Sequence, residues 1–154
     1  MESFLQVCRW GIRFDPEATR QLYAQTSGID CTCTDCARFR AAGEAAYSPP
    51  FLDLLSQFGV DPYKPAELSH YGGSGEPLET HGWFHLVGRL ESGNDAWRQV
   101  GETSFSLETE PFPGIKGIGF SARLSLVPEP FEASPLIQLE FETVVPLVLP
   151  VSRA

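Results

Sequence analysis

The sequence predicts an α+β fold in which short N-terminal helices pack on one face of a mainly antiparallel sheet of about five or six strands. Apolar residues recur at helical spacing over much of the first third of the chain, whereas they alternate with polar residues after about residue 61. The segments between these runs are short and rich in Gly, Pro, Asn and Ser, as connections between consecutive antiparallel strands require.

The chain of 154 residues is expected to form a single domain, with a strand and the helices over about residues 1–60 and the sheet over about residues 61–150. Its 42% hydrophobic and 20% charged content is typical of a globular protein. A domain of this length can bury enough apolar surface to fold without disulfide bonds.

An alternating pattern near the N-terminus predicts a strand over residues 4–14. The apolar side chains on its even positions are those of Phe4, Cys8, Trp10, Ile12 and Phe14. The next residues, Asp15, Pro16 and Glu17, predict a helix start, because they place an acidic N-cap before a proline and a first-turn acid. We expect this helix over residues 16–26, with Gly28 just past its end.

Two more helices are expected before residue 60. Thr34 or Asp35 can cap a helix over residues 36–46, whose residues are mostly good helix formers. The two prolines at positions 49 and 50 are expected to end that segment. The following run then forms one apolar stripe at i, i+3, i+4 and i+7, made by Phe51, Leu54, Leu55 and Phe58.

Five strands are expected in the rest of the chain, over residues 67–71, 81–90, 97–108, 117–127 and 136–145. In the last of them Ile137, Leu139, Phe141 and Val145 share one face, and Phe120, Ala122 and Leu124 of its neighbour are expected to join that face. The helical stripe of residues 51–58 should cover it. Glu140 and Glu142 are expected on the opposite, solvated face, with Arg123 as a cross-strand partner.

The charge of the chain limits its partners. The net charge is −9, the only lysines are Lys64 and Lys116, and the arginines are scattered. Such a surface repels nucleic acids and anionic membranes, so we expect neither as a partner. The charge favours solubility and suits a basic protein partner. The N-terminal residues show no secretory signal, which predicts a cytoplasmic protein.

Three of the four cysteines lie within six residues, as Cys31, Cys33 and Cys36, and the fourth is Cys8. The second thiol of the C-x-x-C pair falls at a predicted helix N-terminus, which favours the thiolate that zinc requires. Structural zinc has four tetrahedral ligands. The fourth would come from solvent or from one of four side chains, Cys8, His70, His81 or His85.

Two other interpretations of the cysteine cluster stay open. The thiols can be reduced side chains that pack where a helix meets the sheet. They can also form a redox pair, although this C-x-x-C follows a loop and not a strand of a βαβ unit. A nucleophile pair such as Cys36 with His85 also stays open, because such partners meet only in the fold.

The second candidate site is the face that His81, Trp83 and His85 share on their predicted strand. Histidines at i and i+4 of a strand lie about 13 Å apart, too far to bind one metal ion together. One of them could join His70 on a neighbouring strand, or the three side chains could line a small-ligand pocket. The alternative is an aromatic strand with two hydrogen-bonded histidines at a sheet edge.

Four segments of the chain resemble a family of uncharacterised bacterial proteins: LYAQTSGIDCTCTDCARFRAA, DLLSQFGVDPYKPAEL, GWFHLVG and LIQLEFETVVPLVL. Members share a C-x-C-x-x-C-x-x-F motif and a late EF-x-x-x-x-P segment, and the resemblance runs from about Leu22 to Leu149. The matching positions are Cys31, Cys33, Cys36, Phe39, Trp83, His85, Glu140, Phe141 and Pro146. Leu147 stands where similar sequences have Trp. The resemblance implies a single domain of bacterial origin and no particular activity.

Two classes of function fit these observations. The first is a small acidic protein-binding module, of the kind that shields a basic toxin surface, with any metal in a structural role. The second is an enzyme or small-ligand-binding protein that uses Cys31, Cys33 and Cys36 or the face of His81, Trp83 and His85. A flat acidic surface would favour the first class, and a deep pocket at these residues would favour the second.

Overall fold

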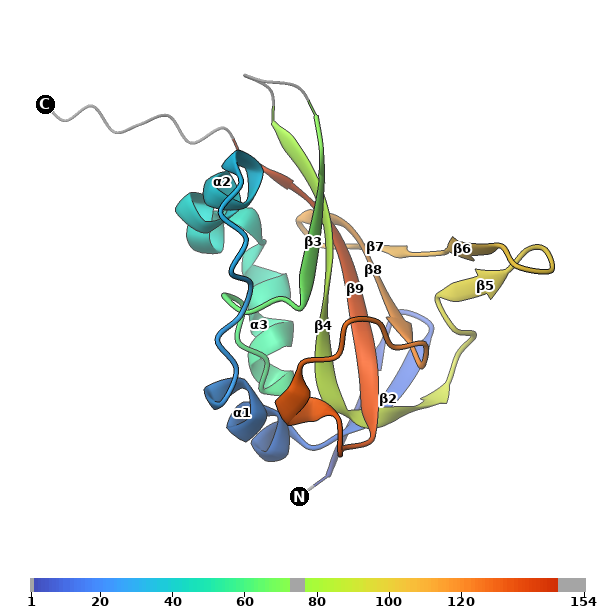
Figure 1. Ribbon diagram of the computed structural model, residues 1–154. Helices are drawn as coiled ribbons and strands as arrows, with labels where there is room; N and C mark the ends of the chain where they lie inside the picture. The colour runs from blue at the N-terminus through green and yellow to red at the C-terminus, as the bar shows by residue number, and fades with distance from the viewer. Residues whose placement is uncertain (1, 73–76, 147–154) are drawn as a thin grey trace, which may run out of the picture.

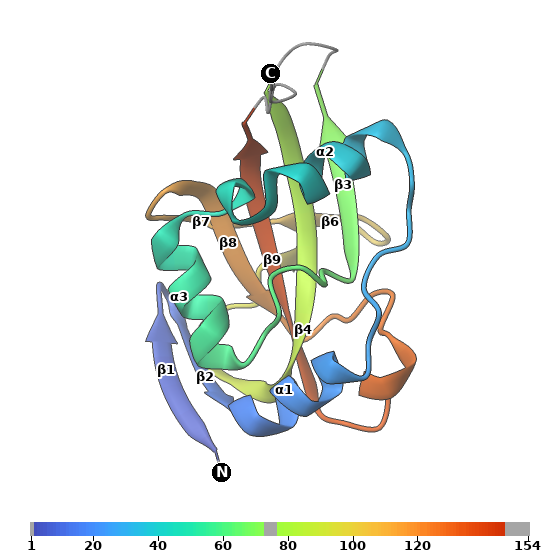
Figure 2. The same cartoon turned by 90° about the vertical axis from the view of Figure 1, so that its left-hand side faces the viewer.

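The computed structural model describes residues 2–72 and 77–146 and shows an α+β protein (Figure 1). Three helices, α1 (Pro16–Ala24), α2 (Thr34–Ala42) and α3 (Pro49–Phe58), lie on one side of a mainly antiparallel sheet (Figure 2). Two 3-10 turns, Gly43–Ala46 and Glu129–Phe131, complete the helical segments in these residues. No helix in the described ranges is long and apolar enough to cross a membrane.

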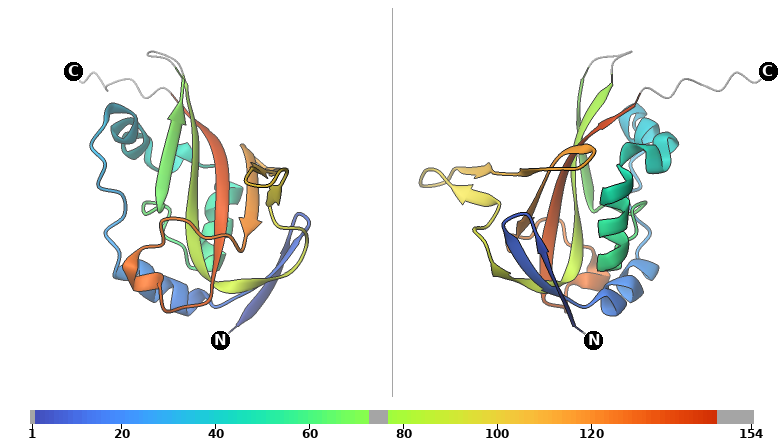
Figure 3. Two further views of the ribbon diagram at one scale, coloured as in Figure 1. Left: turned by 45° about the vertical axis from the view of Figure 1, so that its right-hand side comes forward. Right: turned by 180° about the vertical axis from the view of Figure 1, so that it is seen from behind.

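The main sheet has more strands than expected, with seven in the described residues. They are β1 (Ser3–Val7), β2 (Trp10–Phe14), β3 (Glu67–Tyr71), β4 (Leu78–Ser92), β7 (Glu110–Phe112), β8 (Ile115–Ser121) and β9 (Leu136–Val145). Their order is β1-β2-β4-β9-β8-β7, and β3 also pairs with β4. A separate two-stranded sheet, β5 (Trp97–Gln99) and β6 (Phe105–Leu107), stands away from the sheet on the side opposite the helices (Figure 3).

The N-terminal segment is a hairpin and not the single strand expected over residues 4–14. Val7 pairs with Trp10, so the chain reverses within two residues. Cys8 takes a positive φ of 51° there, as tight hairpin turns require. A two-residue turn preserves the alternation of apolar and polar positions, which explains why the sequence pattern hides it.

The start of α3 also differs from the expectation. Pro49 and Pro50 begin this helix instead of ending the previous segment, because a proline in the first turn loses no helical hydrogen bond. Ser48 caps it, with Oγ accepting a hydrogen bond from the Phe51 amide at 3.2 Å. The segment before it divides at Gly43 into α2 and a 3-10 turn.

Two of the later predicted strands are also wrong in part. Residues 97–108 fold back on themselves as the β5–β6 hairpin. β8 ends at Ser121, where its pairing with β9 stops, so Ala122 and Leu124 are exposed and do not join the apolar face. Arg123 lies over the ring of Phe105, 3.7 Å from its centroid, and not across from a glutamate.

The core lies between α3 and the sheet, as the apolar stripes predicted. All four stripe residues of α3 are buried. The Phe51 ring lies 5.8 Å from that of Phe141, and the Phe58 ring lies 5.8 Å from that of Phe120. These contacts cover the face of β8 and β9 that turns toward the helices.

Helix α1 completes a part of the β4 edge with which no strand in residues 2–72 and 77–146 pairs. β3 pairs with β4 over residues 79–83 and β2 pairs with it over residues 88–92, which leaves a gap between them. There the Tyr23 hydroxyl donates to the His85 carbonyl at 2.7 Å and accepts from the His85 amide at 3.1 Å. Thr19 Oγ1 accepts from the Val87 amide at 2.9 Å. Side chains of a helix thus take the place of a neighbouring strand.

Candidate functional site

The three clustered cysteines lie at the N-terminus of α2. Cys33 is the N-cap, and its Sγ accepts a hydrogen bond from the Cys36 amide at 3.4 Å. This capping geometry turns both sulfurs of the C-x-x-C pair to one side, and Cys31 joins them from the preceding loop. The three Sγ atoms lie within 4.8 Å of one another, so they could hold a metal ion. Cys36 is buried, whereas Cys31 and Cys33 are exposed.

The two thiols of the C-x-x-C pair differ in acidity. The hydrogen bond from the Cys36 amide, with smaller effects of the other two thiols, lowers the pKa of Cys33. Burial, followed by the neighbouring thiols, raises the pKa of Cys36 to about 12. A bound cation would favour ionisation of both thiols, because a positive charge at the sulfurs stabilises the thiolate form of each.

His70 is the histidine that the fold brings to the cysteines. Its Nε2 lies 3.5 Å from the Cys36 sulfur, and its Nδ1 lies 3.0 Å from Oγ1 of Thr80. β3, the strand that includes His70, lies at the edge of the sheet beside α2 (Figure 2). Partial burial lowers the pKa of His70, which favours the neutral ring that can bind a metal.

The other side chains considered as a fourth ligand have different contacts. Cys8 lies exposed at the β1–β2 turn, with its Sγ 3.9 Å from the Pro111 carbonyl. His81 and His85 lie on β4 and contact Glu140 and Gln138 of β9. The fold therefore does not bring Cys36 and His85 together as a nucleophile pair.

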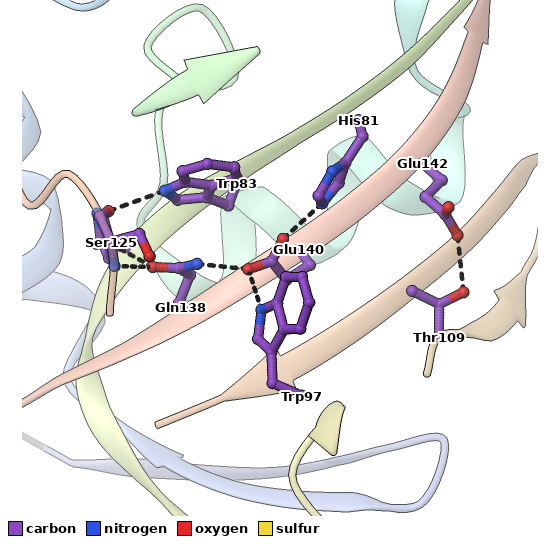
Figure 4. Close-up of polar contacts among 9 residues, drawn as sticks. His81, Trp83, Trp97, Thr109, Ser125, Gln138, Glu140 and Glu142 are labelled. Atoms are coloured by element: carbon purple, nitrogen blue, oxygen red, sulfur yellow. Dashed lines mark hydrogen bonds and ion pairs between the residues drawn. The ribbon is translucent and has the colours of Figure 1, made fainter. Parts of the chain in front are cut away.

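The face of His81, Trp83 and His85 lies against the polar side chains of β9. Trp83 pairs with Glu140 and His85 pairs with Gln138 in the sheet register. The Trp83 indole donates to the Ser125 carbonyl at 3.0 Å, and His85 Nε2 lies 2.9 Å from Gln138 Oε1. Figure 4 shows the contact of Trp83 with Ser125 and the dashed lines that join Gln138 to its neighbours.

Glu140 is fully buried, so the prediction of a solvated face is wrong for this residue. Its carboxylate lies 2.6 Å from His81 Nε2, accepts from the Trp97 indole at 2.9 Å and also accepts from the Gln138 amide (Figure 4). Trp97 belongs to β5, and its indole reaches this face from the β5–β6 hairpin. Glu142 is half-buried and accepts from Thr109 Oγ1 at 2.8 Å.

His85 is also buried, with 1% of its surface exposed, which leaves His81 and Trp83 as the accessible part of the predicted ligand face. Burial lowers the pKa of His85. A hollow beside His81, bounded by Tyr71 and Lys116 among others, has a volume of only about 50 Å³. Typical small-molecule pockets are several times larger, at about 300–1,000 Å³.

Sequence reasoning missed Trp97 as a member of this polar cluster. Gln138, Glu140 and Glu142 recur at alternate positions of β9, which correctly indicates a shared face. The alternation carries no information about what covers that face. Trp97 occurs in a segment that was expected to be a longer strand, so its folding back over Glu140 had no signal in the periodicity.

The fold and this geometry define an α+β protein with a three-cysteine candidate metal centre. No protein-family model matches the chain, and no match was found among curated proteins or solved structures. The resemblance to an uncharacterised bacterial family therefore stays a prediction. Of its positions, Pro146 directly follows β9, and Leu147 lies outside the described residues.

Proposed function

We propose that this protein binds one Zn²⁺ ion through Cys31, Cys33 and Cys36, and that the ion has a structural role. The observation that carries the proposal is the placement of three sulfurs within 4.8 Å of one another at the N-terminus of α2. Soft thiolate ligands select zinc over the harder divalent cations. The proposal also fits a reducing compartment such as the cytoplasm, where thiols stay free of disulfide bonds.

The ion would fix a stretch of chain that has little regular structure of its own. Residues 26–32 connect α1 to α2 without helix or strand. The hydrogen bond of the Cys33 cap is a weak one to sulfur, so it holds this connection poorly by itself. A metal bound by Cys31, Cys33 and Cys36 would hold the end of this connection against the N-terminus of α2.

The test is the zinc content of protein purified without added metal. We expect about one zinc per chain in the wild type and a loss of most of it in Cys33→Ala. Cys33 is exposed, so this substitution has little effect on the core. Cys8→Ser is the matched control, because it removes an exposed cysteine outside the cluster. Equal zinc contents in the wild type and Cys33→Ala would contradict the proposal.

We further propose that the protein acts by binding a basic protein partner, as neutralising modules do, and not by catalysis. The net charge of −9 supports attraction to such a partner. Exposed apolar side chains gather on and after the β5–β6 hairpin, which suits a contact surface. They are Val100, Phe105, Leu124 and Leu126, with exposures of 60%, 37%, 41% and 62%.

A hollow of about 210 Å³ lies on the same surface and is lined by Trp97, Phe105, Arg123 and Ser125. Tryptophan and arginine are the residues that most often dominate the binding energy of protein interfaces. Glu140 is buried and cannot contact a partner, so the attraction to a basic partner would come from the net charge of −9. An enzyme or small-ligand-binding protein that uses the cysteine cluster or His81 and Trp83 is the alternative.

The partner proposal is tested by capture from the source cells at 50 and 500 mM salt. The Debye length shortens from about 14 Å to about 4 Å over this range, so the capture of a basic partner should weaken steeply. Phe105→Ser should reduce capture, whereas Phe4→Ser, at an exposed position of β1, should not. Turnover of a small molecule that Cys36→Ser or His81→Gln abolishes would favour the enzyme instead.

A further inference from the structure

We propose that His70 is the fourth zinc ligand, so that the centre is a closed Cys3His site that joins the N-terminus of α2 to strand β3. This inference rests on the proposed zinc binding at the three cysteines and adds the ligand that completes it. It also assigns the ion a task in the fold, because its ligands would come from two segments that lie 34 residues apart.

The distance between Cys36 and His70 is the distance that two ligands of one zinc ion require. Zinc lies about 2.3 Å from a thiolate and about 2.0–2.1 Å from an imidazole nitrogen, in tetrahedral geometry. These bond lengths place a ligand sulfur and a ligand nitrogen about 3.6 Å apart. The observed separation of Cys36 Sγ and His70 Nε2 is 3.5 Å.

The orientation of the His70 ring is that of a metal ligand. Thr80 pairs with His70 across β3 and β4 and lies buried, with its Oγ1 3.0 Å from Nδ1. A hydrogen bond at one ring nitrogen fixes the tautomer and directs the other nitrogen toward the metal. When Nδ1 donates to Thr80, Nε2 carries the lone pair on the side of Cys36.

The two remaining sulfurs can adjust to this nitrogen. The three sulfurs lie within 4.8 Å of one another. Nε2 of His70 lies next to this group on the side of Cys36. Cys31 and Cys33 are exposed, so rotation of their side chains meets little packing. Cys36 and the Thr80-bound His70 form the fixed half of the site.

A closed site has a structural consequence. Zinc with four protein ligands has no open position for water or substrate, unlike catalytic zinc. Among the strands that the structure describes, β3 pairs with β4 alone, so it is an edge strand held by one ladder. Binding through His70 would attach this strand to α2 as well.

The decisive experiment is X-ray absorption spectroscopy at the zinc edge of the purified protein. We expect about three sulfur neighbours and one nitrogen, with the outer-shell scattering of a single imidazole ring. His70→Asn should abolish the imidazole scattering and weaken zinc binding by at least about tenfold. Asn keeps a polar atom near the position of Nδ1, so the contact with Thr80 has a substitute.

His81→Asn is the matched control, because it removes a histidine of the neighbouring strand that contacts Glu140. It should leave the imidazole scattering and the zinc affinity unchanged. A wild-type spectrum without imidazole scattering would overturn the role of His70 and leave the three-cysteine site intact. A wild-type protein that binds no zinc would overturn both proposals. The wild-type spectrum gives this answer even if His70→Asn does not fold.

Discussion

At the scale of single residues, burial decides what a polar side chain does. Glu140 has no exposed surface and has hydrogen-bonding neighbours on β4, β5 and β9. A buried carboxylate is tolerated only when such partners compensate for its lost hydration. The cluster therefore fixes the position of the β5–β6 hairpin on the sheet, and its carboxylate is not available to steer a partner.

Glu140→Ala should consequently destabilise the fold. The change leaves His81, Trp97 and Gln138 without their common acceptor, so the free energy of unfolding should fall by about 3–5 kcal/mol. Urea denaturation measures this loss. Glu142→Gln serves as the control, because Glu142 is half-buried and, within the described part of the chain, accepts one side-chain hydrogen bond, from Thr109. A loss below about 1 kcal/mol for Glu140→Ala would show that the cluster does not hold the hairpin.

Thr80 offers a test of the metal centre that leaves every ligand in place. Thr80→Val keeps the shape of this buried side chain but removes the oxygen that lies 3.0 Å from Nδ1 of His70. Loss of such a hydrogen bond typically reduces metal affinity by about 10- to 100-fold. Competition with a zinc chelator measures this change. Thr143→Val, which loses a bond to the Ala46 carbonyl, should leave the affinity unaltered.

At the scale of elements, periodicity predicted the segments that have one buried face. The strands expected over residues 67–71 and 136–145 have the bounds of β3 and β9, and the apolar stripe of α3 is buried. The pattern failed where the chain turns without losing its alternation, as at Cys8, and where a segment pairs with itself, as β5 does with β6. Long-range pairing, and not local preference, decides those cases.

The candidate site was likewise predictable in its local part and not in its long-range part. Cys31, Cys33 and Cys36 could be predicted as a cluster because they are close in sequence and their capping geometry is local. His70 was one of several candidates, because only the pairing of β3 with β4 places it beside Cys36.

Helix α1 shows how an element can replace a missing strand. The Tyr23 hydroxyl bonds both the amide and the carbonyl of His85, in the gap of the β4 edge between β2 and β3. Tyr23→Phe leaves two buried backbone groups without this partner, so it should cost about 1–3 kcal/mol in the free energy of unfolding. Thermal or urea melts give the value. Tyr63→Phe, at a position that is 61% exposed, should change stability by less than about 0.5 kcal/mol.

At the scale of the whole molecule, the proposed zinc ion joins the helical layer to the sheet at one end, while α3 joins them through the core. A ligand that binds only the folded protein stabilises it by about 4 kcal/mol when its free concentration is about 1,000 times its dissociation constant. Removal of zinc with a chelator should therefore lower the melting temperature, and Cys33→Ala should abolish the chelator's effect.

The segments that lose protection when zinc is removed distinguish a structural link between α2 and β3 from a uniform increase in stability. With zinc bound through His70, amide hydrogen exchange should be slow both at the start of α2 and in β3, because one ion holds both. After chelation, exchange should accelerate together over residues 26–36 and 67–71, while the amides of β9 in the core stay protected. In His70→Asn, zinc should slow exchange only over residues 26–36. If β3 responds to zinc equally in the wild type and in this variant, the ion does not act through His70.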